Sequence, residues 1–234
     1  YIFGNWVNIG HGLQISTKSP NICNPIAMVS GHNRQMNTEL LPALIGFAFV
    51  TSITPGPNNM MLLASGVNFG VKRTLPHWLG VSLGHFVMLL LVGAGLERLL
   101  NAYPFVYQVM KVLGFAYLVY LAWGVARSGA PERNGEEAVQ PISFLGAAAF
   151  QWVNPKAWVM GIAAIASYTV ASDYFLSLVT VCVVFGLVNI PSIGIWVGFG
   201  TAMRNLLANP RYLRAFNITM ALLLVASMAP LLWR

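Results

Sequence analysis

Charged side chains are scarce in this chain. Only 8% of the residues are charged, whereas 57% are hydrophobic and the mean hydropathy is +0.67. Soluble domains carry charges on about a quarter of their residues, so the composition argues against a soluble globular protein and is typical of an integral membrane protein. A chain of 234 residues has room for about six membrane-spanning helices of ~20 residues and little else.

Cysteines and catalytic signatures are also scarce. Cys23 and Cys182 lie far apart, and neither a CxxC pair nor a His/Cys cluster is present, so we expect no disulfide framework, no metal and no cofactor. The chain lacks a GxxxxGK[ST] loop, which argues against ATP-driven export by this chain alone. It also lacks HExxH and any recognisable nucleophile with a base, so an enzyme is not indicated.

The first 35 residues differ from the rest. Gly, Asn, Ser and Pro are scattered through 1–35, which has neither helical periodicity nor the basic and apolar regions of a signal peptide. We predict that this polar leader is disordered or not part of the native chain, which would then start at Met36. Residues 36–234 are predicted to form one polytopic membrane domain.

Six apolar runs follow the leader, each long enough at 1.5 Å per residue to cross a ~30 Å hydrocarbon core. They fall at about 40–66, 75–96, 105–126, 143–170, 174–200 and 213–232. The stretch 127–142 carries Pro, Gly and mixed charges, and is predicted to be a solvated loop between two halves of three helices. None of the runs contains Asp or Glu, which removes the usual carboxylate for proton or sodium coupling.

Lysine and arginine between the runs predict the orientation, because cytoplasmic loops are rich in both. The first, third and fifth connections hold seven of them: Lys72, Arg73, Arg127, Arg133, Arg204, Arg211 and Arg214. The opposite side keeps Arg98 and Arg234, if the leader is set aside. We therefore expect both termini to lie outside.

Two of the runs are interrupted near mid-span, at corresponding places in the two halves. "TPGPNN", Thr54 to Asn59, breaks the first run, and "NPK", Asn154 to Lys156, breaks the fourth. Halves with an odd number of spans lie in the membrane with opposite orientation, as in the inverted repeats of many secondary transporters. The sequence therefore predicts an all-α fold of about six transmembrane helices in a 3+3 inverted repeat, with helices one and four broken.

The first break has the chemistry of a ligand site. Pro55 and Pro57 flank Gly56, so one helical segment should end there and another begin at Pro57. The N–H groups of Asn58 and Asn59 would then be unpaired at a half-helix N-terminus, which attracts carboxylates. A structural kink is the alternative interpretation of a single break, but two breaks in symmetric places favour a site that also includes Thr54, Asn154 and Pro155.

Lys156 is a charge in the middle of an apolar run, where a lysine costs about 2.5–3.5 kcal/mol. A substrate carboxylate, a solvated cavity or a half-helix C-terminus could each compensate it. His85 is a second candidate for proton coupling, although a neutral hydrogen-bonded histidine between helices is the commoner case. Asn189 and Pro191 indicate either another local break or a helix contact.

Four segments resemble the LysE/RhtB family of amino-acid exporters: "TPGPNN", "GVSLGH", "LGFAYLVYLAW" and "NPKAW". The resemblance extends from about Met36 to the end. Within the family, "PISF", "FQWVN" and "FNITMALLLV" look closest to the branch that exports cysteine and O-acetylserine. The family motif falls on Thr54, Pro55, Gly56, Pro57 and Asn58, and on Asn154, Pro155 and Lys156.

The resemblance implies a multi-pass protein of the bacterial inner membrane that exports amino acids or close derivatives, driven by the proton gradient. Its partners would be a small zwitterionic substrate, the bilayer and coupling protons; nucleic acid is not expected, and a homodimer stays open. Lys156 would either bind substrate or release and regain a proton. Two alternatives from other classes are a membrane-embedded enzyme and a non-transporting assembly protein.

Overall fold

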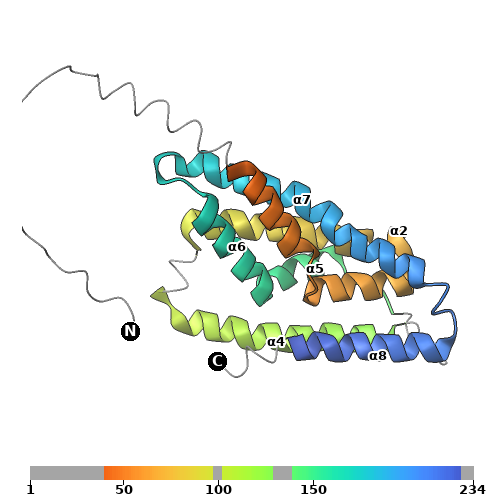
Figure 1. Cartoon of the computed structure of the whole chain (residues 1–234). Coiled ribbons are helices and arrows are strands. Elements are labelled where there is room, and N and C mark those ends of the chain that lie inside the picture. The colour runs from red at the N-terminus through yellow and green to blue at the C-terminus, as the bar shows by residue number, and fades with distance from the viewer. Residues whose placement is uncertain (1–39, 97–101, 129–138, 228–234) are drawn as a thin grey trace, which may run out of the picture. The chain divides into compact units, whose positions relative to one another are not determined.

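The computed structural model describes residues 40–96, 102–128 and 139–227. All of these belong to one compact unit, Asn37–Arg234. Every regular element within the described ranges is a helix (Figure 1). The prediction of a polar leader at 1–35 concerns residues outside these ranges.

The first apolar run forms two helical segments, as predicted. A helix spans Leu40–Ile53, residues 54–56 are not helical, and α2 (Pro57–Leu91) begins with Pro57 at its first turn. Proline at this position has a preset φ and lacks only an N–H that a first turn does not need. The break therefore lies where the two prolines predict it.

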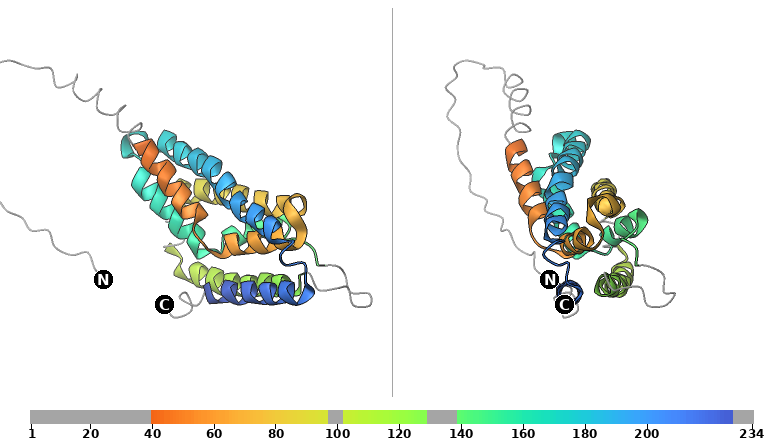
Figure 2. Two further views of the ribbon diagram at one scale, coloured as in Figure 1. Left: turned by 45° about the vertical axis from the view of Figure 1, so that its right-hand side comes forward. Right: turned by 90° about the vertical axis from the view of Figure 1, so that its right-hand side faces the viewer.

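α2 changes direction at Gly70, where φ is 74° and ψ is 174°. This φ lies in the left-handed region, which a glycine adopts without the steric penalty of a Cβ. α2 therefore comprises two helical segments, 57–69 and 71–91, and the second folds back alongside the first (Figure 2). A π-helical turn, η1 (Val92–Leu96), follows.

The fourth apolar run is broken in a similar way. The Ser143 side chain caps α5 (Phe144–Gln151) by accepting a hydrogen bond from the Gly146 N–H. Residues 152–154 separate α5 from α6 (Pro155–Tyr168), which again starts with a proline and has Asn154 as its N-cap. Asparagine is among the most favourable N-cap residues.

The remaining helices are uninterrupted: α4 (Pro104–Arg127), α7 (Tyr174–Met203) and α8 (Pro210–Ser227), with a short 3₁₀ turn η2 (Ala171–Asp173) before α7. α7 continues through Pro191, so the local break considered there does not form. α4 and α8 pack side by side (Figure 1).

Three described helical stretches are long and apolar enough to cross a membrane: Pro57–Leu96, Gln108–Arg127 and Ala171–Met203. Leu40–Ile53 is apolar but shorter. The fourth apolar run, which is divided into α5 and α6, provides no single helix of this length.

α2 packs against both α5 and α7. Gly80 and Gly84 allow the contact with α5, since a Cβ on Gly80 would collide with the Phe144 carbonyl oxygen and one on Gly84 would stand 2.6 Å from Ala148 Cα. The small-xxx-small spacing of these glycines is therefore a packing feature. Close packing of this kind holds the two broken regions next to each other.

Candidate functional site

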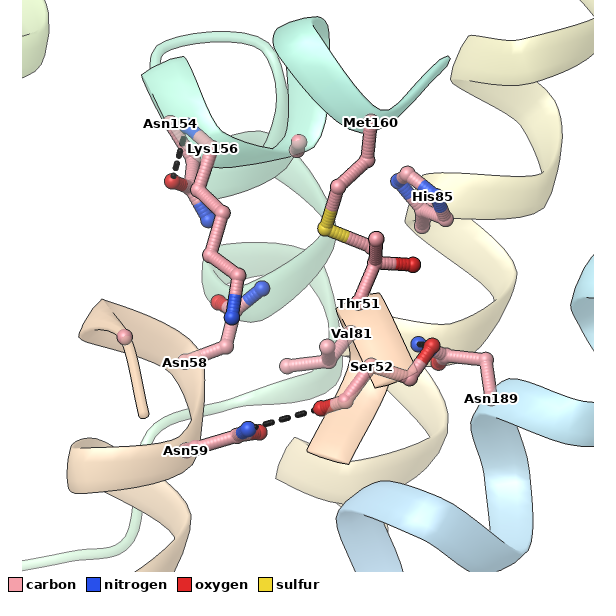
Figure 3. A pocket seen from close by; sticks show the side chains of 12 residues that line it. Thr51, Ser52, Asn58, Asn59, Val81, His85, Asn154, Lys156, Met160 and Asn189 are labelled. Atoms are coloured by element: carbon pink, nitrogen blue, oxygen red, sulfur yellow. Dashed lines mark hydrogen bonds between the residues drawn. The ribbon is translucent and has the colours of Figure 1, made fainter. Parts of the chain in front are cut away.

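A pocket lies where the two helix breaks meet (Figure 3). It is lined by the end of the first half-helix, the starts of α2 and α6, two residues from the second segment of α2 and one from α7. The lining residues are Thr51, Ser52, Gly56, Asn58, Asn59, Val81, His85, Asn154, Lys156, Ala157, Met160 and Asn189. Segments far apart in the sequence thus form one polar site inside an apolar bundle.

The carbonyl groups at the end of helix Leu40–Ile53 are satisfied by side chains from elsewhere. A helix leaves its last four carbonyls without intrahelical partners. Asn59 Nδ2 donates to the carbonyls of Ser52 and Thr54, both at 2.8 Å, and Trp196 Nε1 of α7 donates to the Ile53 carbonyl at 3.1 Å. Each unpaired backbone carbonyl at a helix end in hydrocarbon would cost several kcal/mol. These hydrogen bonds therefore stabilise the break within an apolar bundle.

Lys156 completes this arrangement. Its Nζ donates to the Thr54 carbonyl at 2.6 Å, the Thr54 hydroxyl at 3.0 Å and the Pro55 carbonyl at 3.4 Å. The negative end of the first half-helix therefore compensates the lysine charge, which is one of the three explanations that the sequence left open.

Gly56 makes room for the lysine side chain. A Cβ at Gly56 would stand 2.8 Å from Lys156 Cδ and 3.2 Å from Nζ. The backbone of Gly56 is extended and unstrained, with φ −178° and ψ 176°, so the requirement for glycine is steric.

Two amide side chains connect the broken regions directly. Asn58 Nδ2 donates to Gln151 Oε1 at 2.8 Å, and Gln151 Nε2 donates back to Asn58 Oδ1 at 3.1 Å. Gln151 Nε2 also donates to the Ala147 carbonyl, which orients it at the end of α5. Within the second break, Asn154 Oδ1 accepts a hydrogen bond from the Lys156 backbone N–H at 3.2 Å and so caps α6.

The predicted site residues have different positions in this structure. Five line the pocket: Gly56, Asn58, Asn59, Asn154 and Lys156. Thr54 and Pro55 contact the lysine ammonium. Pro57 and Pro155 begin the two half-helices.

His85 also lines the pocket, and its ring lies against Phe185 of α7 with the centroids 5.8 Å apart. Other lining residues were not predicted from the sequence as site residues. Ser52 and Met160 look like ordinary members of apolar helices. Gln151 does not line the pocket but bonds to Asn58, and the sequence shows it only as an amide beside the second break. The described residues contain no group of three or more His, Cys, Asp and Glu side chains that could hold a metal ion.

Two pairs of half-helices meet around a polar pocket within an apolar helical bundle. This arrangement is typical of membrane transporters. The chain belongs to the LysE type translocator family, whose family model matches residues 49–232.

Cysteine/O-acetylserine efflux proteins of two Escherichia coli strains and of Shigella sonnei are among its relatives. The proteins of Escherichia coli K12 and Shigella sonnei are 32% identical to this chain, and that of Escherichia coli O1:K1 is 31% identical. Each match covers 81% of this chain and 96% of the relative. No solved structure matches the chain.

Proposed function

We propose that this protein is a secondary-active exporter of amino acids or close derivatives across the bacterial cytoplasmic membrane. The observation that carries the proposal is the meeting of two half-helix N-termini and one lysine in a single pocket. Membership of the translocator family and the efflux names of the relatives support it. Those names make cysteine and O-acetylserine the first substrates to test.

The substrate carboxylate would bind at the starts of α2 and α6. The first intrahelical bond of α2 runs from the Met60 N–H to the Gly56 carbonyl, so the N–H groups of Asn58 and Asn59 precede the ladder. Peptide dipoles make such helix ends favourable for anions. Lys156, which stands beside them, would exchange its carbonyl partners for the carboxylate.

We infer that six spans form a 3+3 inverted repeat within a single membrane domain from residue 36 onward. In this interpretation, Leu40–Ile53 with the first segment of α2 is span one, and α5 with α6 is span four. Each begins a half and each is broken before a proline. The breaks would be corresponding parts of the two repeats and would allow alternating access.

The same interpretation places both termini outside. Basic residues from distant parts of the chain gather at one end: Arg73 donates to the Gln140 side chain at 3.1 Å, and the Arg204 guanidinium lies 3.4 Å from the position of a Cβ on Gly70. We assign this end to the cytoplasm on the positive-inside rule. Arg98, Arg133 and Arg234 lie outside the described residues.

Export would be driven by the proton gradient. Asp173, in the turn η2 before α7, is the one carboxylate among the described residues and does not line the pocket, so Lys156 and His85 are the candidates for carrying the coupling proton. An uncoupler that collapses the proton gradient should stop concentrative transport, whereas exchange of labelled for unlabelled substrate at equilibrium should continue.

The first experiment is an uptake assay in inside-out membrane vesicles, where an exporter accumulates its substrate. The panel contains labelled cysteine, O-acetylserine, threonine, leucine, lysine and arginine, with energised vesicles from cells lacking the chain as the control. Accumulation of at least one unmodified amino acid is expected. Equal uptake with and without the chain, with the protein present in the membrane, would contradict the proposed function, and chemical conversion of the solute would favour an enzyme.

A further inference from the structure

Two buried polar atoms at the pocket have no hydrogen-bond partner within the described part of the chain. They are Nε2 of His85 and Oδ1 of Asn189, on side chains that are only 4% and 5% exposed. Buried polar groups in folded proteins are nearly always paired, so unpaired ones in a pocket wall call for an explanation. Neither atom has a role in the carboxylate site described above.

The Asn189 side chain is held in position from one side only. Its Nδ2 donates to Ser52 Oγ at 3.1 Å, which leaves the carbonyl oxygen of the same amide as a free acceptor. His85 packs on Phe185, one helical turn before Asn189 on α7. Asn189 and His85 thus belong to neighbouring parts of the pocket wall, formed by α7 and the second segment of α2 (Figure 3).

This wall is close to the start of α2. Ser52 connects them, because its hydroxyl accepts from Asn189 and its carbonyl accepts from Asn59 at 2.8 Å. Two hydrogen bonds through one residue therefore join the Asn189 amide to the half-helix N-terminus. An amino acid carries its carboxylate and ammonium groups on one carbon atom, so one bound molecule would present a group to each of these two parts of the pocket.

The free atoms suit a cation. An amide oxygen is an acceptor only, and Nε2 of a neutral histidine is an acceptor when the proton is on Nδ1. Lys156, the cation among the lining residues, is engaged with the carbonyls of Thr54 and Pro55. An ammonium group offers three donors and a positive charge to such acceptors.

We propose that Asn189 and His85 bind the α-ammonium group of the substrate through Asn189 Oδ1 and His85 Nε2. This inference rests on the proposed function and adds to it: the pocket selects zwitterions with a free amino group and rejects carboxylic acids that lack one. Asn189 contributes the larger part, since Ser52 orients its amide.

The test compares L-cysteine with 3-mercaptopropionate, which has the same thiol and carboxylate but no ammonium group. Both compete against labelled L-cysteine for uptake into inside-out vesicles, and the ratio of their half-inhibitory concentrations measures the contribution of the ammonium. In the natural protein, 3-mercaptopropionate should be weaker by about tenfold or more, as expected for a charge-assisted hydrogen bond.

Asn189→Leu should bring this ratio down to about one to three, by weakening cysteine and leaving 3-mercaptopropionate almost unchanged. Asn189→Asp keeps an oxygen at the same place and should keep the ratio at least as high as in the natural protein. Ser192→Ala is the matched control, because Ser192 is a buried polar residue of α7 that does not line the pocket and bonds only to its own helix at Val188. Its ratio should not change.

Two outcomes would overturn the inference while leaving the proposed function intact. In the first, Asn189→Leu weakens both competitors equally, as a purely structural residue would. In the second, Asn189→Asp transports cysteine but no longer distinguishes it from 3-mercaptopropionate. This second outcome also tests the inference if Asn189→Leu fails to reach the membrane. Absence of uptake of any amino acid by the natural protein would contradict the proposed function itself.

Discussion

Lys156 is the residue on which the proposed mechanism depends most. It is a cation placed between the carbonyls at one half-helix end and the N-terminus of another. Lys156→Met should therefore lower substrate uptake into vesicles at least tenfold while the protein still inserts. The control is Lys111→Met, since Lys111 lies on α4 and does not line the pocket. Full transport by the Lys156 variant, with insertion verified by immunoblot, would refute the assignment.

Gly56 should matter through the space that it leaves. Gly56→Ala adds a methyl group 2.8 Å from Lys156 Cδ, so the lysine must leave its present position and loses its bonds to Thr54. We expect a several-fold fall in transport with little effect on stability, because a flexible side chain rather than backbone is displaced. Gly46→Ala on the preceding half-helix is the control, since nothing lies within 4 Å of a Cβ there. Equal effects of both changes would argue against a steric role for Gly56.

At the scale of helices, the reciprocal bond between Asn58 and Gln151 should couple the two breaks. Leucine at either position removes both bonds between the two side chains, so the double variant should be destabilised less than the sum of the single ones. We expect a coupling energy of about 1 kcal/mol, in the range measured for side-chain hydrogen bonds in membrane proteins.

Thermal unfolding in detergent would measure this coupling. The control cycle pairs Gln151 with Asn68, which bonds instead to Asn217 and the Ala64 carbonyl. The Asn68 and Gln151 substitutions should be additive within about 0.5 kcal/mol. Additivity of Asn58 and Gln151 as well would show that their bond does not stabilise the contact between the breaks.

The helical elements were predictable wherever a residue type has one strong local effect. Proline in "TPGPNN" and "NPK" begins a new helix at Pro57 and Pro155, and both breaks form where these residues predict them. Pro191 shows the limit of this rule. Proline is tolerated inside α7, because this helix continues through Pro191. Whether a proline breaks a membrane helix or is accommodated in it depends on hydrogen-bond partners that neighbouring helices supply to the freed backbone groups. The local sequence does not show these partners.

The site was predictable in part. Charge and amides at mid-span identified Lys156, Asn58 and Asn154, because their burial in hydrocarbon needs compensation. Thr54, the partner of Lys156, is 102 residues away along the chain. No local pattern could therefore show that a half-helix end, rather than a substrate carboxylate or a solvated cavity, compensates the lysine charge. Gln151 and Ser52 were not predicted as site residues, because a single polar residue near a helix end is common. Their roles depend on hydrogen-bond partners that only the folded chain brings next to them.

For the whole molecule, the proposed orientation is the most direct prediction. A reporter active only in the periplasm, fused after residue 234, should be active, and one fused in the loop around residue 133 should not. The positive-inside rule supplies the physical reason, because Arg73 and Arg204, which come from distant parts of the chain, lie at the same end of the unit. A green fluorescent fusion, which needs the cytoplasm, serves as the reciprocal control. The opposite pattern would reverse the proposed topology.

The three oxygen partners of Lys156 also bear on leakage. To open the pocket to the opposite side of the membrane, an empty carrier would have to separate the Lys156 ammonium from these oxygens with nothing to replace them. This separation would cost about 2.5–3.5 kcal/mol, the cost of a lysine in hydrocarbon. That slows the empty cycle by roughly 100-fold, whereas a bound carboxylate removes the barrier. Loss of the bound carboxylate would therefore return the protein to the state in which these oxygens hold the lysine, so reorientation would be tied to the presence of cargo.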